Sequence, residues 1–435
     1  MRWTKPLSLR WLAALMAFAA TLLAATPSQA VPAYARQTGK VCSSCHFQHY
    51  PALNDFGMDF KASGYVDMKN KPLAGKELSL ADSLYGGIFT KIRYQKSNGT
   101  DGTDANGDAV KSTHSGELQF PDEFALLLGG RIAPNIGFLL EGQLASGGDA
   151  VLAGFKMPMV WALGETGMKG GVVPYTTDGL GASYGFELLN TGAVRNVRIS
   201  EHRNETSAQQ YVFFQDHGAA TGFAFTLYDP KFFVVVAPFT PNHLPGAGSN
   251  IGGLSSTYLR AAFTPTVAGW SLAAGVQVWQ GNKARVDDGG SLLTGSTKGW
   301  SIDAQAQGAV AGMPLGVYLA HAKAPGSAAG GTQNLFNTNP NSRTATTVTA
   351  ELGVLPQKAT VILALRRADN GAATYSGDNA VTLGGTFQLY QNVQLQLAHS
   401  TRGKKNGVGR YGPNVPAEGT KGGSAMTTLM LSAGF

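Results

Sequence analysis

The chain has 435 residues, a formal net charge of +7 at pH 7, 57 glycines and only 14% charged residues. Subtracting the three basic residues of the leader (Arg2, Lys5 and Arg10) from +7 leaves +4 for the mature chain. This mild surplus, without a stripe of Lys and Arg interleaved with aromatics, argues against nucleic acid as a partner. After the leader the sequence has no apolar run long enough for a spanning helix, so any membrane must be crossed by strands.

Residues 1–30 are predicted to be a secretory signal peptide. Its basic residues precede an apolar run at 11–25, and Ser28-Gln29-Ala30 forms a small-x-small cleavage site. The alternative, an uncleaved membrane anchor, is disfavoured because the run is too short for a spanning helix. The mature chain is therefore expected to begin near Val31, outside the cytoplasm.

The next feature is Cys42-Ser43-Ser44-Cys45-His46, which has the C-x-x-C-H pattern of a c-type haem attachment site. Two thiols at this spacing form thioether bonds to one porphyrin, and the following His46 supplies an axial nitrogen to the iron. The alternatives are a redox disulfide and half of a zinc site. Zinc needs further Cys or His pairs, and the chain has only these two cysteines. We predict one covalent haem c.

Residues 31–76 are predicted to form a small α-helical haem c module. One short helix should carry the motif, and a second should carry Leu53, Phe56 and Phe60 on one face, with Gly64 ending it. A unit of this size buries too little surface to fold alone. We therefore expect it to be a plug or docked cap, supported by the walls around it.

The sixth iron ligand is less defined by the sequence. His49 lies three residues from His46 and would leave a helix on the same side, so a surface or propionate-side position is expected for it. Met68 is the favoured sixth ligand, with Met58 as the runner-up. For both methionines, an exposed or packed side chain remains the alternative.

Residues 77–435 alternate with period two and are predicted to form a porin-like transmembrane β-barrel. Val393, Leu395 and Leu397, for example, alternate with Gln394 and Gln396. Small and neutral polar residues opposite an apolar row fit an aqueous lumen opposite lipid, and short turns alternate with long Gly-, Asn- and Ser-rich loops. The alternating last strand ends on Phe435, like the terminal signal read by the outer-membrane assembly machinery.

We predict about sixteen antiparallel strands, with turns on the periplasmic side, loops outside, and the boundaries between 146 and 220 the least defined. The expected ranges are 79–95, 118–132, 136–145, 151–163, 169–176, 221–228, 232–240, 256–264, 269–281, 298–310, 315–323, 344–355, 359–369, 379–389, 393–401 and 425–435.

Residues 177–210 form the longest predicted loop. Long porin loops often fold inward, where charged side chains could steer a cation toward the haem. The candidate residues are Glu187, Glu201, His202 and Glu205. The alternative is a solvated surface loop.

The combination resembles the outer-membrane cytochrome–porin fusions of iron-oxidising bacteria. The likeness is carried by the haem motif with its flanks and by 184–192; the flanking residues are Ala35–Gly39, Pro51, Leu53, Phe56-Gly57, Phe60-Lys61 and Gly64-Tyr65. It implies an oxidoreductase in the outer membrane, with Cys42 and Cys45 holding the haem and His46 as axial ligand. Extracellular Fe(II) would donate one electron, and a periplasmic cytochrome or cupredoxin would accept it. No catalytic residue beyond the haem is implied.

Three other functions stay open from the sequence. The chain could be a diffusion porin whose haem module is a plug or sensor, or a conduit for a donor other than iron. It could also be a membrane-tethered haem peroxidase or gas sensor, which would require an open sixth coordination position.

Overall fold

A single closed wall of antiparallel strands dominates the computed structural model. The residues that the structure describes are 33–66, 73–74, 79–80, 85–99, 102–103, 109–110, 116–144, 152–192, 199–214, 217–243, 253–282, 284–288, 291–374, 376–403 and 423–435. The predicted signal peptide and Met68 lie outside these ranges.

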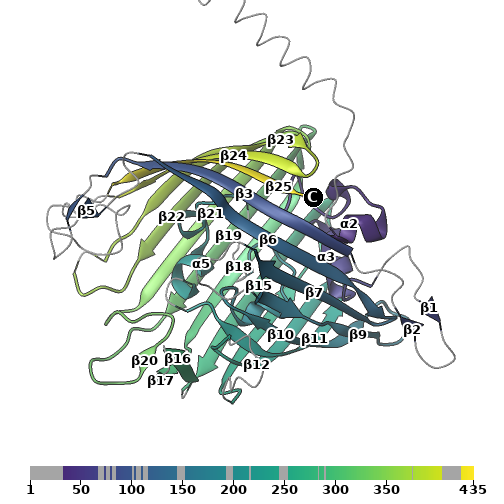
Figure 1. Cartoon of the computed structure of the whole chain (residues 1–435), viewed down its shortest axis with the longest axis horizontal. Coiled ribbons are helices and arrows are strands. Elements are labelled where there is room, and N and C mark those ends of the chain that lie inside the picture. Colours follow the sequence, from purple (N-terminus) through teal and green to yellow (C-terminus); the bar gives the residue numbers. More distant parts are fainter. Residues whose placement is uncertain are drawn as a thin grey trace, which may run out of the picture.

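The strands of the wall follow the chain order, and each pairs with its neighbours (Figure 1). They are β3 (Tyr85–Ser97), β6 (Glu117–Ala133), β7 (Ile136–Gln143), β8 (Leu152–Lys156), β9 (Met159–Ala162), β10 (Lys169–Thr177), β11 (Ala220–Asp229), β12 (Phe232–Thr240), β13 (Ser256–Phe263), β14 (Thr266–Val267), β15 (Trp270–Gly281), β18 (Gly299–Val310), β19 (Met313–Ala324), β21 (Arg343–Leu355), β22 (Ala359–Asp369), β23 (Ala380–Tyr390), β24 (Val393–Arg402) and β25 (Ala425–Gly434).

Within the described ranges, the wall has sixteen strands, as predicted. β8 and β9 both pair with β10 and β7, so they are one strand, interrupted where Pro158 cannot donate a ladder hydrogen bond. β13 and β14 both pair with β15 and form a second interrupted strand. The predicted ranges agree with the observed ones to within a few residues, including those between 146 and 220.

The last strand closes the barrel against the first. β25 pairs with β3 from Met426 opposite Ser97 to Gly434 opposite Phe89, and Phe435 exchanges two backbone hydrogen bonds with Ile88. The predicted start of the first strand at 79 is wrong. Ser79–Leu80 (β2) pairs instead with Leu73–Ala74 (β1) in a separate two-stranded sheet, and the wall begins at Tyr85.

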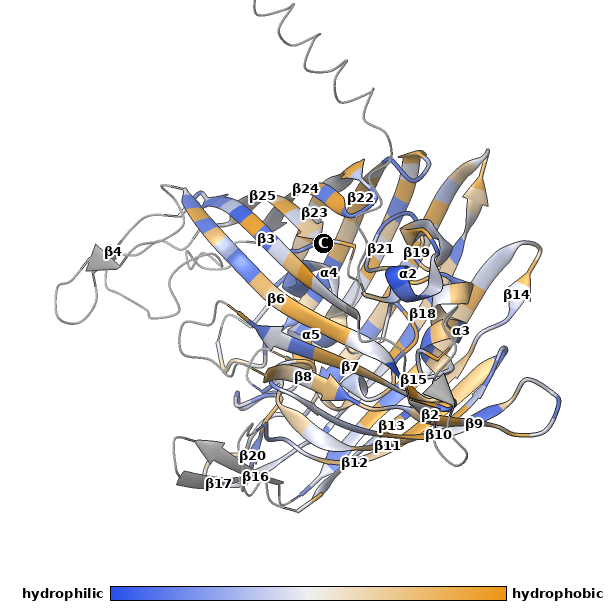
Figure 2. Cartoon of the chain, turned by 45° about the vertical axis from the view of Figure 1, so that its right-hand side comes forward, coloured by the Kyte–Doolittle hydropathy of each residue, from blue (hydrophilic) through white to orange (hydrophobic). Residues whose placement is uncertain are grey.

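The two faces of the wall differ in polarity, as the alternation predicts. On β24 the outward Leu397 is 53% exposed, whereas Gln394 and Gln396 face inward and are each 3% exposed. Figure 2 shows the same alternation as orange and blue or white along the strands. A closed barrel with an apolar outer surface is the only sheet that satisfies its backbone in lipid. The chain is therefore a porin-like β-barrel of the outer membrane.

The short turns and the long connections lie at opposite ends of the barrel. Tight turns join β6 to β7, β18 to β19 and β23 to β24, and this turn end is the periplasmic one. The loop end carries two small sheets, formed by β4 (Gly102–Thr103) with β5 (Ala109–Val110) and by β16 (Ala284–Asp288) with β17 (Ser291–Ser296) and β20 (Gln333–Asn334). Among the described residues, no helix is long and apolar enough to span a bilayer.

Helical segments precede the wall and also interrupt the connection between β10 and β11. The N-terminal ones are α2 (Ala33–Thr38), the 3-10 turn η1 (Cys42–Ser44) and α3 (Asp55–Ala62). The others are η3 (Ala182–Tyr184), α4 (Arg203–Thr206) and α5 (Ala208–Phe213). Figure 1 shows α2 and α3 at the turn end, and α5 within the outline of the barrel.

The second predicted helix of the module forms in part as α3, which carries Phe56 and Phe60 and ends before Gly64 at φ +74°, but Leu53 lies outside it, before the helix cap Asn54. The expectation that a helix carries the haem motif is wrong in detail. Cys42 begins the single 3-10 turn η1, Cys45 directly follows it, and the helix before them, α2, stops at Thr38 because Gly39 adopts φ +62°.

Candidate functional site

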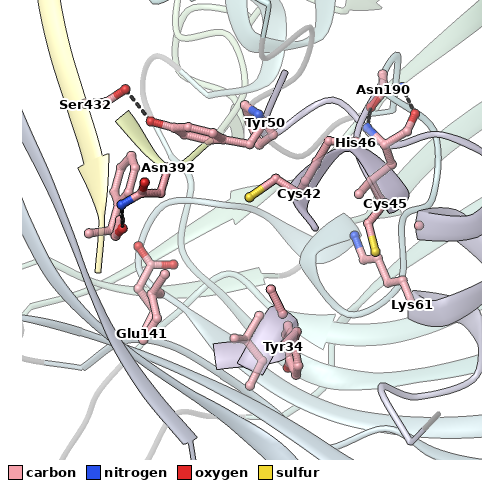
Figure 3. A pocket seen from close by; sticks show the side chains of 18 of the residues that line it. Tyr34, Cys42, Cys45, His46, Tyr50, Lys61, Glu141, Asn190, Asn392 and Ser432 are labelled. Atoms are coloured by element: carbon pink, nitrogen blue, oxygen red, sulfur yellow. Dashed lines mark hydrogen bonds between the residues drawn. The ribbon is translucent and has the colours of Figure 1, made fainter. Parts of the chain in front are cut away.

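The haem motif forms a compact turn that directs its three side chains to one cavity. The backbone amides of Cys45 and His46 both donate to Cys42 O, at 3.2 and 3.0 Å. Cys42, Cys45 and His46 all line the same cavity (Figure 3). The C-x-x-C-H spacing in the sequence therefore places the three side chains around one cavity.

The start of α3 holds this turn in place. Asn54 caps the helix by accepting from Gly57 N at 2.9 Å, and its amide donates to Ser43 O and Ser44 O at 3.3 and 3.1 Å. Gly57 lies so close that a Cβ there would be 2.2 Å from Cys45 O. The sequence Asn54-x-x-Gly57 is thus a second part of the motif, and only its cap pattern could have been recognised from the sequence.

The ring of His46 is oriented by a backbone carbonyl. Its Nδ1 donates to Ala52 O at 3.2 Å, and because a carbonyl only accepts, Nδ1 carries a proton. In the neutral ring Nε2 is then the unprotonated nitrogen, which is the form that binds a metal. A carbonyl acceptor on the second nitrogen is also the usual partner of a metal-bound histidine.

Both cysteine side chains are partly buried, and they do not form a disulfide with each other. Burial raises the pKa of Cys42 and of Cys45, although Lys40 partly counters this effect at Cys45. Reactive redox cysteines have a lowered pKa instead. The direction of the shift thus differs from that of a thioredoxin-like pair, the alternative to a haem site raised by the sequence.

The cavity itself has a volume of about 430 Å³, within the range of cofactor sites. Apolar and aromatic side chains of the module and the wall, such as Tyr34, Phe60 and Leu139, form much of its lining. Four cationic side chains also line the cavity and could balance the charge of the two propionate carboxylates of a haem. They are Lys40, Lys61, Lys156 and Arg203. These residues fit a haem c, with Cys42 and Cys45 for the thioether bonds and His46 for the iron. In the described part of the chain no cluster of three His, Cys, Asp or Glu side chains could hold a metal ion.

The methionine expected as runner-up for the sixth ligand lies elsewhere. Met58 is 7% exposed and packs in the hydrophobic cluster that contains Ala62, Val173 and Tyr175, outside the set of residues that line the cavity. This placement matches the packed alternative for Met58. Met68 lies outside the described residues and stays a prediction.

The module docks into the turn end through hydrogen bonds to many strands. Tyr34 donates to Phe138 O on β7 at 2.8 Å, and Gln37 to Gly129 O on β6 at 2.6 Å. Lys169 at the start of β10 pairs with Asp59 at 2.7 Å. These strands lie on one side of the wall, and His49 contacts Glu351 on β21 at the opposite side, so residues 33–66 form a plug in the barrel mouth, in agreement with the predicted plug or docked cap.

Of the two positions expected for His49, the surface one is wrong, and the propionate-side one stays a prediction. His49 is 4% exposed, and its Nε2 lies 2.6 Å from the Glu351 carboxylate on β21. Its Nδ1 lies 2.6 Å from Tyr50 O. Burial by itself lowers the pKa of His49, but Glu351 and the Tyr50 carbonyl outweigh burial and raise that pKa above its ordinary value. Sequence reasoning also missed Glu351, whose only signal is a carboxylate in an inward-facing row.

The described residues between β10 and β11 fold into the lumen, so the surface-loop alternative is wrong for them. We call the described residues 178–192, 199–214 and 217–219 the inner loop. Glu187, His202 and Glu205 are each 2–3% exposed, and Glu201 is partly buried. Of the four predicted loop residues, Glu187 and Glu201 line the haem-motif cavity, whereas His202 and Glu205 do not. Their suggested role in steering cations stays a prediction.

Each of the four predicted loop residues is paired with the barrel wall. Glu187 pairs with Arg260 on β13, Glu201 with Lys91 and Arg93 on β3, and Glu205 with Arg402 on β24. Burial raises the pKa of Glu201 and of Glu205, but the cations outweigh it. They hold the pKa of Glu201 well below its usual range and lower that of Glu205 to about 2.

His202 has neutral partners only. Its ring nitrogens lie 2.6 Å from Ser400 Oγ and 2.7 Å from Thr428 Oγ1. Burial, with Arg93 and Arg402 nearby, lowers the pKa of His202 to about 4 despite Glu205. The ring is therefore neutral at pH 7.

The inner loop contacts the wall on opposite sides of the lumen. Lys156 on β8 donates to Tyr184 O at 3.0 Å, Thr191 donates to Asp303 on β18 at 2.6 Å, and Gln396 on β24 donates to Ile199 O at 2.8 Å. The loop also joins the plug, because Asn190 exchanges two hydrogen bonds with the Leu53 backbone, at 2.8 and 2.9 Å. The cavity of the haem motif thus lies between the plug and the inner loop.

Neither a protein-family model nor a curated protein matches the chain. Solved outer-membrane channels share its general architecture. An anion-selective porin from Comamonas acidovorans is 15% identical, with 81% of this chain and 99% of that chain covered and a TM-score of 0.46. OprB of Pseudomonas putida is 10% identical, with 90% and 99% covered and a TM-score of 0.48. The channel DcaP of Acinetobacter baumannii is 13% identical, with 81% and 97% covered and a TM-score of 0.42.

Proposed function

We propose that the chain is an outer-membrane electron conduit that oxidises extracellular Fe(II) and passes the electron to a periplasmic cytochrome or cupredoxin. The observation that carries the proposal is the position of the C-x-x-C-H side chains, which converge on a cavity lined by the plug, the barrel wall and the inner loop. A haem c bound there would supply a one-electron acceptor. The motif and its flanks also resemble the cytochrome–porin fusions of iron-oxidising bacteria.

The chain's own residues would have distinct tasks in this function. Cys42 and Cys45 would bind the cofactor covalently, and the His46 imidazole would bind iron through Nε2 while Ala52 fixes its orientation. The inner loop would separate the cavity from the loop end, so that an electron enters while ferric iron stays outside. The plug keeps the site at the periplasmic mouth, within reach of a soluble carrier.

A diffusion porin with a haem plug or sensor is the second candidate. The sixteen-strand barrel favours it directly, because this architecture is that of a channel-forming porin. The inner loop argues for the conduit instead, since it contacts the wall on opposite sides and takes up space that a diffusing solute would need. A conduit for a donor other than iron would use the same structure.

Anaerobic addition of Fe(II) to the purified, detergent-solubilised protein tests the proposal. We expect the absorption bands of ferrous haem c to appear. The control is His46→Ala, which should keep a folded barrel but lose haem stability and iron-dependent reduction. A haem c that Fe(II) leaves oxidised would overturn iron as the donor, and a reduced organic donor would then be tried.

Conductance in a planar bilayer separates the two candidates. The conduit predicts a small conductance, because the plug and the inner loop both fill the lumen. A conductance of porin size that is the same in wild type and in His46→Ala would favour the diffusion porin and contradict the conduit.

A further inference from the structure

Three charged side chains form a buried cluster between the inner loop and the wall. Arg260 on β13 lies between Asp303 on β18 and Glu187 on the inner loop, and the three side chains are at most 2% exposed. Two carboxylates therefore share one guanidinium. If both carboxylates are ionised, the cluster carries one uncompensated negative charge, and burial makes such a charge costly.

The surplus charge falls on Glu187 and not on Asp303. Arg260 contacts Asp303 at 2.5 and 2.8 Å but Glu187 at 3.1 and 3.3 Å. Asp303 also accepts from Thr191 at 2.6 Å and from Gln277 at 3.3 Å. Glu187 accepts, besides the guanidinium, from Leu189 N at 3.0 Å. Of the two carboxylates, Glu187 has the weaker set of donors.

Glu187 is also the member of the cluster that borders the haem-motif cavity. The charged and titratable groups that face it are Arg260 and Tyr258 from β13, Asp303 from β18 and Lys61 from α3. Burial and Asp303 raise the pKa of Glu187 and outweigh Arg260, the Leu189 amide and Lys61, so this pKa lies above its ordinary value. The protonation of a buried carboxyl group with a raised pKa responds to a change of charge nearby.

We propose that the Glu187 carboxylate takes up a proton from water when an electron enters the adjoining cavity, and releases the proton when the electron leaves. This inference rests on the proposed function, because it needs a one-electron acceptor at the motif. The electron comes from the external donor and goes to the periplasmic carrier, so each turnover restores both the charge and the proton. Proton uptake keeps the buried surroundings of the cavity closer to neutral in both redox states.

The consequence is a reduction potential that depends on pH. Where one proton accompanies one electron, the potential falls by up to about 59 mV for each pH unit. Glu187 has one pKa when the electron is in the cavity and another when it is not. At pH values outside the range between these two, the potential should be independent of pH.

The test is a spectroelectrochemical titration of the full-length, haem-loaded protein over a pH series from the ordinary carboxyl range to neutrality. Wild type should show a sloping region. Glu187→Gln should be flat, because an amide does not titrate. Asp303→Asn should keep the slope but move the sloping region to lower pH, because Arg260 is then paired with Glu187 alone. Redox difference infrared spectra should show a carboxyl C=O band that Glu187→Gln lacks.

Glu201→Gln is the matched control, since Glu201 lines the same cavity but is compensated by Lys91, Arg93 and Arg203. It should shift the potential while keeping the slope. A pH-independent wild-type potential, or an unchanged slope in Glu187→Gln, would overturn the inference. Failure of the proposed function looks different, because the purified protein would then contain no haem c, or its haem would not respond to Fe(II) at any pH.

Discussion

Two buried histidines, one in the plug and one in the inner loop, have pKa values shifted in opposite directions. Both partners of His49, the ionised Glu351 carboxylate and the Tyr50 carbonyl, only accept hydrogen bonds, so they favour the form of the ring with a proton on both nitrogens. The partners of His202 are the hydroxyls of Ser400 and Thr428, which can donate or accept. The neutral ring of His202 is therefore fully satisfied.

The comparison shows that depth in the lumen does not decide the charge of a histidine. Both side chains are almost fully buried, and burial lowers the pKa of each. The carboxylate of Glu351 reverses this effect for His49, whereas a hydroxyl pair cannot do so for His202. The chemistry of the nearest wall residue thus sets the pH response of each inserted segment.

The stabilising effects of the two histidines have opposite pH dependence. The raised pKa of His49 contributes stability that is fully present below the ordinary value of 6.5 and is lost as pH rises through the raised pKa. The lowered pKa of His202 contributes stability that is present above 6.5 and is lost as pH falls toward about 4. Acid should therefore loosen the inner loop before the plug.

Glu351→Gln is expected to have the largest effect, because it should make His49 behave like His202. Breaking a buried charged pair costs about 3–5 kcal/mol. That cost applies at acidic pH, where His49 would otherwise be charged. The free energy of local opening of residues 33–66, from hydrogen exchange across a pH series, measures it. Val348→Ala, on the lipid-facing side of the same strand, is the control. An unchanged pH profile would show that the pair does not hold the plug.

Acidification of the wild-type protein should have the next largest effect. Lowering the pKa of His202 from 6.5 to about 4 corresponds to about 3 kcal/mol, which the inner loop loses across this pH range. Hydrogen exchange of residues 199–214 should accelerate accordingly. His202→Gln removes the titrating group, and equal acid sensitivity in that variant would contradict the assignment.

Asn190→Ala is expected to have the smallest effect of the three and tests the contact between the two segments. It leaves the partly buried Leu53 amide without its partner, at a cost of about 1–2 kcal/mol. Gln307→Ala is the control, since Leu53 O keeps its bond from Asn190. Limited proteolysis should show faster cleavage in the plug for Asn190→Ala than for the control. Equal rates would mean that the junction contributes little.

Local patterns in the sequence were enough to predict the wall. Alternation on strands such as β24, together with the order of turns and loops, gave sixteen strands, because lipid outside and polar surroundings inside act on every second residue. The motif residues Cys42, Cys45 and His46 were predicted from their spacing alone. The inward fold of the inner loop was one of two alternatives, and its charges gave no basis for choosing between them.

Other features of the site depend on residues far apart in the chain. Glu351 meets His49 across 302 positions, and Asn190 meets Leu53 across 137. Arg260 joins Glu187 to Asp303 only because β13 and β18 lie beside the inner loop. No local pattern marks such partners, since each is one polar residue in an inward-facing row.

The sequence by itself therefore determined the type of wall, the number of its strands and the position of the haem motif, because these follow from periodicity and spacing between near neighbours. Only the tertiary structure decided which charged residues of the inserted segments contact which charged residues of the wall. These contacts determine the direction in which the pKa of each buried group is shifted. Closing the barrel brings inserted segments against wall residues from distant strands, and the energy of a buried charge depends on those few neighbours.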